Sequence, residues 1–239
     1  MNLKGYRLIF EDDFNGTELN TEVWRYRGTG KQRIANCHPS QVRLENGNLV
    51  IKCEYQKDGA VGEGWYTGQI SLKEWFCRGY FEAKMLCNDP GANGFWSAFW
   101  LQAKHPYTAA SCGGIHGAEI DIVEAFRTPE GYPAAMSNIH CAGYHDGSES
   151  NGIRSQCVAF KRLPDCYSAY HVFGLEWTEE AYRIFIDDVC VGVSTWADGV
   201  NVEEDELIFS LCAPEKDPGP DAPSGELIAD WVRVYKKED

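Results

Sequence analysis

Three acidic residues lie close together near the middle of the chain and alternate with apolar residues. Glu119, Asp121 and Glu124 belong to the run Glu-Ile-Asp-Ile-Val-Glu. Alternation with isoleucine and valine is typical of a β-strand that buries one face. The other face would carry carboxyl groups side by side, which is unfavourable for like charges. The pattern therefore indicates a use for the acids in catalysis, with an acidic sheet edge or a calcium-binding strand as alternatives.

The spacing of the acids requires an irregular strand. Side chains alternate between faces, so Glu119 and Asp121 share a face while a regular strand would send Glu124 to the apolar side. One extra residue, a β-bulge near residues 122–123, would return Glu124 to the acidic face. The outer Cα atoms would then lie roughly 13 Å apart. Two glutamates leaning together could bring their carboxyl groups to about 5 Å, the separation of the catalytic pair in retaining glycosidases.

The composition describes a well-cored protein with an acidic surface. Of 239 residues, 44% are hydrophobic and 13% aromatic. Eight Trp and twelve Tyr exceed the needs of a core, and aromatic rings suit sugar rings, with core packing as the alternative for each. The net charge of −14 argues against nucleic acid and anionic membranes as partners. It also disfavours a strongly sulfated glycan, unless a local basic groove overrides it.

Ten cysteines are scattered without a CxxC pair, which argues against a zinc ribbon. Cys157 and Cys166 flank a short loop and are the best candidates for a disulfide. Cysteines within apolar strand patterns are expected to be buried free thiols: Cys53, Cys77, Cys190 and Cys212. No signal-peptide pattern or transmembrane run stands out, and Met1 is compatible with a chain whose leader has been removed.

Short alternating segments separated by turn signals surround the acidic strand. Strands are predicted at 6–10, 67–71, 79–86, 95–101, 137–140, 171–177, 182–186, 189–193, 207–211 and 227–235. Asn46-Gly47 between two apolar runs predicts a hairpin over 42–51. Residues 102–118 and 142–165 are expected as loops, and only 178–183 have a helical tendency. The pattern predicts an all-β sandwich that forms a single domain over residues 1–239.

Seven motifs then point to a known family. The acidic run reads ExDxxE, and it is accompanied in order by LIFEDDFNG (8–16), LENGNLVI (44–51), RGYFEAK (78–84), SAFWL (97–101), HVFGLEWT (171–178) and DWVRVY (230–235). Together they resemble glycoside hydrolase family 16 over nearly the whole chain. The resemblance implies a jelly-roll β-sandwich of two antiparallel sheets with a concave substrate cleft. Its ExDxxE subgroup, which includes laminarinases, agarases, porphyranases and carrageenases, has the bulge that the spacing requires.

The resemblance implies endo-hydrolysis of a β-linked glucan or galactan with retention at the anomeric carbon. Glu119 would be the nucleophile, and Glu124 the general acid and then the general base. Asp121 would raise the pKa of Glu124 through its charge, and could hydrogen-bond Glu119 and orient it. No cofactor is expected for catalysis.

Substrate-binding residues follow from the same resemblance. Trp96 and Trp100 share a face of the strand before the acids, and His140 lies on the strand after them, within reach of a catalytic carboxylate. Glu176 and Trp177 are further cleft candidates. For each residue a position in the core is the alternative, and His116 is expected at the surface.

A structural calcium ion is a further implication. Asp13, the carbonyl group of Gly47 and Asp230 match positions where many family members hold calcium on the convex face, and oxygen ligands suit Ca²⁺. We also expect a monomer that meets its polysaccharide outside the cell or at the cell surface.

The chain departs from the family around the cleft. Residues 32–40 lack the NNELQYYT segment of laminarinases, and Gln69 replaces the arginine of YTSARL. Because no run of Lys and Arg lies near the cleft loops, we expect a neutral β-1,3-glucan or mixed-linkage β-1,3-1,4-glucan as substrate. An endo-β-galactanase acting on agarose, porphyran or carrageenan is the second hypothesis. A non-catalytic carbohydrate-binding sandwich is the rival from another class, but it would not need the three acids.

Overall fold

β-Strands make up most of the structure. The computed structural model describes residues 3–103, 115–141, 154–196 and 199–238. The helical segments among them are the 3₁₀ turn η1 (Pro39–Gln41) and the short helix α1 (Pro90–Asn93). The strands are β1 (Tyr6–Asp12), β2 (Trp24–Tyr26), β3 (Gly30–Gln32), β4 (Ala35–Cys37), β5 (Val42–Glu45), β6 (Asn48–Gln56), β7 (Gly64–Thr67), β8 (Gln69–Phe76), β9 (Gly79–Leu86), β10 (Trp96–Ala103), β11 (Glu119–Arg127), β12 (Pro133–Cys141), β13 (Arg154–Arg162), β14 (His171–Trp177), β15 (Tyr182–Ile186), β16 (Val189–Ser194), β17 (Asp205–Cys212) and β18 (Gly225–Lys237).

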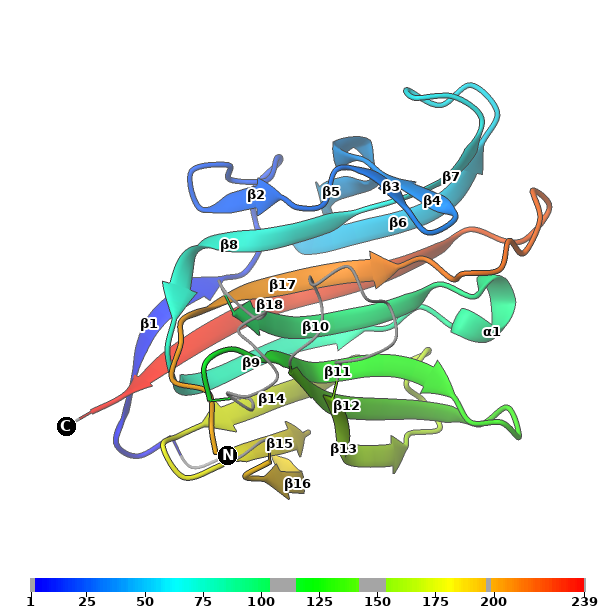
Figure 1. Cartoon of the computed structure of the whole chain (residues 1–239). Helices are drawn as coiled ribbons and strands as arrows, with labels where there is room; N and C mark the ends of the chain where they lie inside the picture. The colour runs from blue at the N-terminus through cyan, green and yellow to red at the C-terminus, as the bar shows by residue number, and fades with distance from the viewer. Residues whose placement is uncertain (1–2, 104–114, 142–153, 197–198, 239) are drawn as a thin grey trace.

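The strands form two sheets that pack as a sandwich (Figure 1). The larger sheet has eleven strands in the order β16-β15-β14-β9-β18-β6-β7-β4-β3, with β1 paired to β18 and β5 to β6. The smaller sheet has seven strands in the order β13-β12-β11-β10-β17-β8-β2. Pairing is antiparallel, apart from the parallel pair β4 and β7. The predicted all-β sandwich of two sheets is therefore confirmed.

Aromatic side chains fill the space between the sheets. Phe99 on β10 and Phe209 on β17 are fully buried and stack with ring centroids 4.8 Å apart. Phe14 and Trp24 pack against the same Phe209 ring. Full burial of a side chain of this size contributes about 1.5–3 kcal/mol. This packing fixes β10 and β17, whose opposite faces line the cleft described below.

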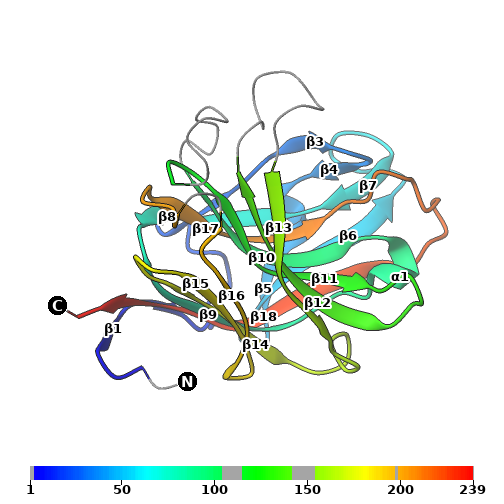
Figure 2. The same cartoon turned by 60° about the horizontal axis from the view of Figure 1, so that its bottom comes forward.

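The predicted hairpin turn at residues 46–47 is confirmed, whereas β2, β3, β4 and β13 were not predicted as strands. Asn46 and Gly47 both have positive φ, 52° and 73°, as a tight two-residue hairpin turn requires. The region 178–183 contains no helix, and α1, which ends at Gly94 with φ 78°, lies at the end of the sandwich away from the chain termini (Figure 2). β13 falls within the expected loop 142–165, so that prediction is wrong for residues 154–162. Part of each expected loop, 104–114 and 142–153, lies outside the described residues.

The cysteines in the described residues are free thiols. The predicted bridge between Cys157 and Cys166 is therefore wrong, because both are free thiols and Cys157 is exposed on β13 while Cys166 is fully buried. Cys53 is buried as predicted, but Cys190 is exposed and Cys77 and Cys212 are partly exposed. Cys112 lies outside the described residues. Among those residues, no helix has the length and apolar character needed to cross a bilayer.

Candidate active site

The three acids lie on one face of β11, where a bulge brings them together. The register of β11 with β12 shifts between Asp121 and Glu124, and the register with β10 shifts at the same place. Ile122 and Val123 stand where a regular strand has one residue, and both are 1% exposed and belong to the core. The predicted bulge at residues 122–123 is confirmed.

Ser137 on the neighbouring strand β12 forms a hydrogen bond with the backbone of the bulge. Its Oγ donates a hydrogen bond to the carbonyl oxygen of Ile122 at 2.7 Å, and the Ser137 side chain is buried. A bulge disrupts the regular ladder of backbone hydrogen bonds, and a buried carbonyl group left without a donor is unfavourable. The serine therefore supplies a buried donor where the pairing of β11 and β12 is interrupted.

An open cleft of about 460 Å³ lies over this face of the smaller sheet. Glu119, Asp121 and Glu124 line it from β11, and Trp96 and Trp100 line it from the neighbouring β10. Arg27 and Arg33, which precede and follow β3 in the sequence, also line it. The cleft therefore combines a carboxylate floor with aromatic and basic groups.

Glu124 is held by two N–H donors. Trp96 donates from Nε1 to Oε1 at 3.0 Å, and Asn138 on β12 donates from Nδ2 to Oε2 at 2.7 Å. A carboxyl group has about four lone-pair sites, so two donors can fix its plane and still leave a site for a proton. This arrangement suits a group that must give up a proton and take one back in a constant orientation.

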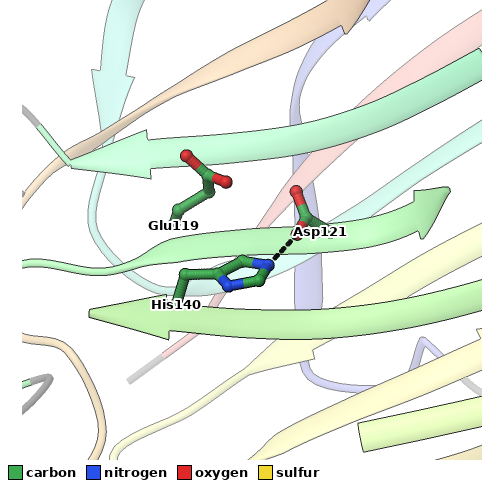
Figure 3. A group of neighbouring side chains, drawn as sticks. All are labelled: Glu119, Asp121 and His140. Atoms are coloured by element: carbon green, nitrogen blue, oxygen red, sulfur yellow. Dashed lines mark ion pairs between the residues drawn. The ribbon is translucent and has the colours of Figure 1, made fainter. Parts of the chain in front are cut away.

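Asp121 is the most buried of the three acids, at 4% exposed. Its pKa is raised well above the usual value by burial, and then by the negative charges of Glu124 and Glu119. His140 on β12 places Nε2 3.0 Å from Oδ2 of Asp121, and its Nδ1 lies 2.6 Å from Ser155 Oγ. Figure 3 shows the imidazole directed at Asp121, with Glu119 beside the pair. The expected contact between His140 and an acid of this strand is present, and a protonated Asp121 could donate to the imidazole. His140 is not among the residues that line the cleft, and its contact with substrate stays a prediction.

Glu119 receives a hydrogen bond from the strand on its other side. Gln102, its register partner on β10, donates from Nε2 to Oε2 of Glu119 at 2.9 Å. The amide therefore lies beside the predicted nucleophile. An N–H donor of this kind favours the ionised carboxylate.

Both cleft tryptophans have a cation beside the ring. Arg27 lies over Trp100 with its guanidinium carbon 5.0 Å from the ring centroid, and Arg33 lies over Trp96 at 4.8 Å. The indole N–H of Trp100 donates to Ser210 on β17 at 3.0 Å. Both rings are partly exposed in the cleft, as predicted. Their contact with sugar stays a prediction.

Two predicted substrate-binding residues lie elsewhere. Trp177 is 1% exposed and belongs to the core between the sheets, where its Nε1 donates to the carbonyl of Asn201 at 3.1 Å. Glu176 lies next to it in β14 of the larger sheet, where it accepts from Tyr6 at 2.8 Å and Arg183 at 2.9 Å. Neither residue lines the cleft, so the prediction is wrong for both. His116 is half-exposed, as expected.

Sequence reasoning missed four polar residues that contact the acids or the cleft tryptophans. Gln102 and Asn138 occupy cleft-facing positions at period two from Trp100 and His140, so strand alternation could have identified them. Arg27 and Arg33 come from a region without a motif, and nothing local in the sequence connects them to residues 96–124.

The carboxylates expected to bind calcium each face a cation of the chain. Asp230 accepts from Lys84 Nζ at 2.7 Å, and Asp13 lies 3.8 Å from Arg233. Gly47 occupies the turn between β5 and β6. Because Ca²⁺ would have to compete with both cations, these contacts do not favour it, and the structural calcium stays a prediction. Glu119 and Asp121 in the cleft and the neighbouring His140 each offer one ligand atom, within 4.8 Å of one another, a spacing that a hydrogen-bonded cluster also has.

Comparison with known proteins identifies the family of the chain. The family model described as "Beta-porphyranase A-D, GH16 domain" matches residues 9–237. The chain belongs to glycoside hydrolase family 16.

Relatives of this family 16 domain carry several names. It is 25% identical over 272 residues to glucan endo-1,3-beta-glucosidase A1 of Niallia circulans, covering 99% of this chain but only 39% of that protein. It is 23% identical over 257 residues to the beta-glucanase of Rhodothermus marinus, covering 97% of this chain and 85% of that protein. The crystal structure of porphyranase B from Zobellia galactanivorans superposes with a TM-score of 0.77 at 20% identity, covering 98% of this chain and 94% of that one. This likeness confirms the jelly-roll fold.

Proposed function

We propose that this family 16 domain is a retaining endo-glycosidase that hydrolyses internal β-linkages of a polysaccharide. The observation that carries the proposal is the position of Glu119 and Glu124 on one face of β11, on either side of Asp121, in an open cleft. The lead substrate is a β-1,3-glucan or a mixed-linkage β-1,3-1,4-glucan. The names of the Niallia and Rhodothermus relatives support this choice.

The proposed reaction has two displacement steps. A carboxylate oxygen of Glu119 attacks the anomeric carbon while the proton of Glu124 passes to the glycosidic oxygen, so the leaving chain departs as an alcohol. Glu124 then takes a proton from water, the water oxygen attacks the same carbon, and the bond to Glu119 breaks. Each step inverts the anomeric carbon, so the product retains its configuration. The donors Trp96 and Asn138 would hold Glu124 through both steps.

A galactan with anionic substituents is the second candidate, and Arg33 favours it. The expectation of a neutral glucan rested on a lack of basic residues near the cleft, yet two arginines line it. Arg27 pairs with Glu206, whereas Arg33 donates to the carbonyl of Ala213 at 2.9 Å and has no acidic partner among the described residues. A guanidinium suits oxyanions such as sulfate. The name of the matching family model, which refers to porphyranases, agrees with this candidate.

Reducing-sugar release from laminarin, lichenan, agarose, porphyran and carrageenan tests the proposal. Release from laminarin or lichenan that is lost in both Glu119→Gln and Glu124→Gln supports the lead. Release only from porphyran or carrageenan, weakened at least tenfold by Arg33→Gln, supports the second candidate. Binding without release from any of them would point to a non-catalytic carbohydrate-binding sandwich. Near wild-type turnover in either glutamate variant would overturn the catalytic assignment.

The setting of the enzyme is also part of the proposal. We propose that it acts outside the cell or at the cell surface, because polymeric glycans are met there. We propose that it acts as a monomer, since an endo-acting cleft on one subunit needs no second copy. Size-exclusion chromatography coupled to light scattering tests the second statement.

A further inference from the structure

We infer that Arg27 and Gln102 form a positioning pair that fixes the orientation of Glu119 and keeps its carboxylate ionised. The inference rests on the proposed function, in which Glu119 is the nucleophile. The two residues come from distant segments. Gln102 lies on β10 beside Glu119, and Arg27 follows β2.

The orientation of the Gln102 amide is decided by Arg27. An amide presents an oxygen that accepts and a nitrogen that donates, and the two ends are interchangeable in shape. Arg27 donates from Nη2 to Oε1 of Gln102. Because a guanidinium has only donors, the amide oxygen must face Arg27. The nitrogen of Gln102 therefore faces Glu119, where it lies 2.9 Å from Oε2 and donates.

Arg27 is itself held on several sides. Its Nε donates to Oε1 of Glu206 at 2.9 Å, its Nη1 donates to Gln69 at 3.3 Å, and its guanidinium lies over the ring of Trp100 at 5.0 Å. Glu206 is 7% exposed. Burial alone would raise the pKa of Glu206, but hydrogen bonds and charges from Arg25 and Arg27 outweigh it and the pKa is lowered. Glu206 is therefore a fixed anion that keeps Arg27 in place.

This support matters because Glu119 shares its strand face with Asp121 and Glu124. A second carboxyl group that ionised beside Glu119 would repel its charge. The other titratable or charged residues that line the cleft or flank Glu119 are His140 on β12, Cys212 and Glu206 on β17, and Arg27 and Arg33. A nucleophile must be ionised to attack. A donated N–H, polarised by a guanidinium behind it, favours the ionised form.

The pH dependence of kcat/KM tests the inference, because its acidic limb reports the ionisation of the nucleophile in the free enzyme. Gln102→Leu removes the donor, and Arg27→Met removes the group that orients it. We expect each change to move the acidic limb upward by about 1 pH unit and to lower kcat more than it raises KM. Gln102→Glu keeps a partner for Arg27 but presents an acceptor to Glu119, so the limb should move further.

A double variant separates positioning from direct contact with the sugar. If Arg27 acts through Gln102, the acidic limb of Arg27→Met/Gln102→Leu should match that of Gln102→Leu alone. Arg43→Met is the matched control. It removes an arginine that pairs with Glu45 and Glu226 and does not line the cleft, so the acidic limb should stay where it is.

The outcomes distinguish this inference from the proposed function. Near wild-type turnover in Glu119→Gln would overturn the assignment of Glu119 as the nucleophile in the proposed function. If Glu119→Gln is inactive but the Gln102 variants keep the acidic limb of the wild type, only the positioning pair is overturned. Thermal melts of every variant confirm folding, and if Arg27→Met does not fold, Gln102→Glu decides, because it retains the contact with Arg27.

Discussion

The indole nitrogen of Trp96 lies 3.0 Å from Oε1 of Glu124, across the neighbouring strands β10 and β11. The ring expected to hold sugar therefore also holds the acid. Trp96→Phe keeps most of the ring and removes this N–H. Loss of one hydrogen bond to a carboxyl group corresponds to about tenfold in rate. We expect that loss in kcat, with KM within about twofold, in initial-rate measurements on the best substrate.

Trp100→Phe provides the comparison for Trp96→Phe. It removes an equivalent N–H that goes to Ser210 instead of an acid, so we expect its effect on KM rather than kcat. Equal changes of KM in both variants, with kcat unaffected, would contradict a role of Trp96 in holding Glu124.

Burial of Asp121 makes the stability of the domain depend on pH. Because its pKa is higher in the folded state, the unfolded chain ionises first as pH rises. The contribution of Asp121 to stability is present below its pKa in the unfolded chain, about 3.9. It is lost as pH rises toward its raised pKa in the folded protein. Asp121→Asn should therefore raise Tm at pH 7 by about 2 °C or more, with the gain vanishing near pH 4, while lowering kcat. Calorimetry between pH 4 and pH 7 measures the difference in Tm between Asp121→Asn and wild type. A difference that did not change with pH would contradict this prediction.

Asp205 offers a second buried carboxyl group outside the cleft. It is fully buried with a raised pKa, its Oδ1 accepts from Asn201 at 2.7 Å, and its Oδ2 has no hydrogen-bond partner in the described part of the chain. We expect Asp205→Asn to raise Tm at pH 7 in the same way but to leave kcat unchanged. If kcat fell as much in Asp205→Asn as in Asp121→Asn, the loss of activity in both variants would come from a change in the sheet as a whole.

Ser137 tests the contribution of the bulge. Removal of its hydroxyl in Ser137→Ala leaves the buried carbonyl of Ile122 without this donor, which costs about 1–3 kcal/mol. We expect Tm to fall by about 2–4 °C per kcal/mol and kcat to fall with it, because Glu124 follows the bulge. Thr67→Val removes a comparable buried bond, to the carbonyl of Leu211 at 2.5 Å, from a residue that does not line the cleft. It should lower Tm alone.

Thiol labelling tests the distribution of cysteines. Cys157 and Cys190 are exposed free thiols and should react with iodoacetamide in the folded protein. Cys53 is buried, and burial raises the pKa of its thiol to about 12, so it should react only after unfolding. Peptide mapping by mass spectrometry distinguishes the sites. A peptide that joins Cys157 to Cys166 under non-reducing conditions would contradict the structure.

The sequence predicted features that depend on local pattern. Alternation and spacing located the bulge at residues 122–123, and Asn46-Gly47 located a hairpin, because a face or a turn is decided by adjacent residues. Strand alternation should also have placed Trp177 in the core, since Phe173, Leu175 and Trp177 share one apolar face of β14. The prediction that Trp177 lines the cleft followed the resemblance of residues 171–178 to the family motif instead.

Features that depend on distant partners were not predicted. β13 contains arginine, lysine, serine and glutamine with one largely exposed face, so its pattern resembles a polar loop until β12 pairs with it. Arg27 reaches Gln102 across 75 positions of the sequence. No local spacing connects such residues, and their contact exists only because β2, β8, β17 and β10 are successive neighbours in one sheet.

The bulge has a consequence for insertions and deletions. Elsewhere in a paired strand, loss of one residue exchanges the side chains beyond it between the two faces of the sheet. Ile122 and Val123 together occupy a single strand step, so removal of either would leave Glu119, Asp121 and the following glutamate on the cleft face. The sequence between the acids can therefore change in length by one residue without changing which side of the sheet they face. At the bulge, the strand can lose one residue and still keep the same side chains on the cleft face.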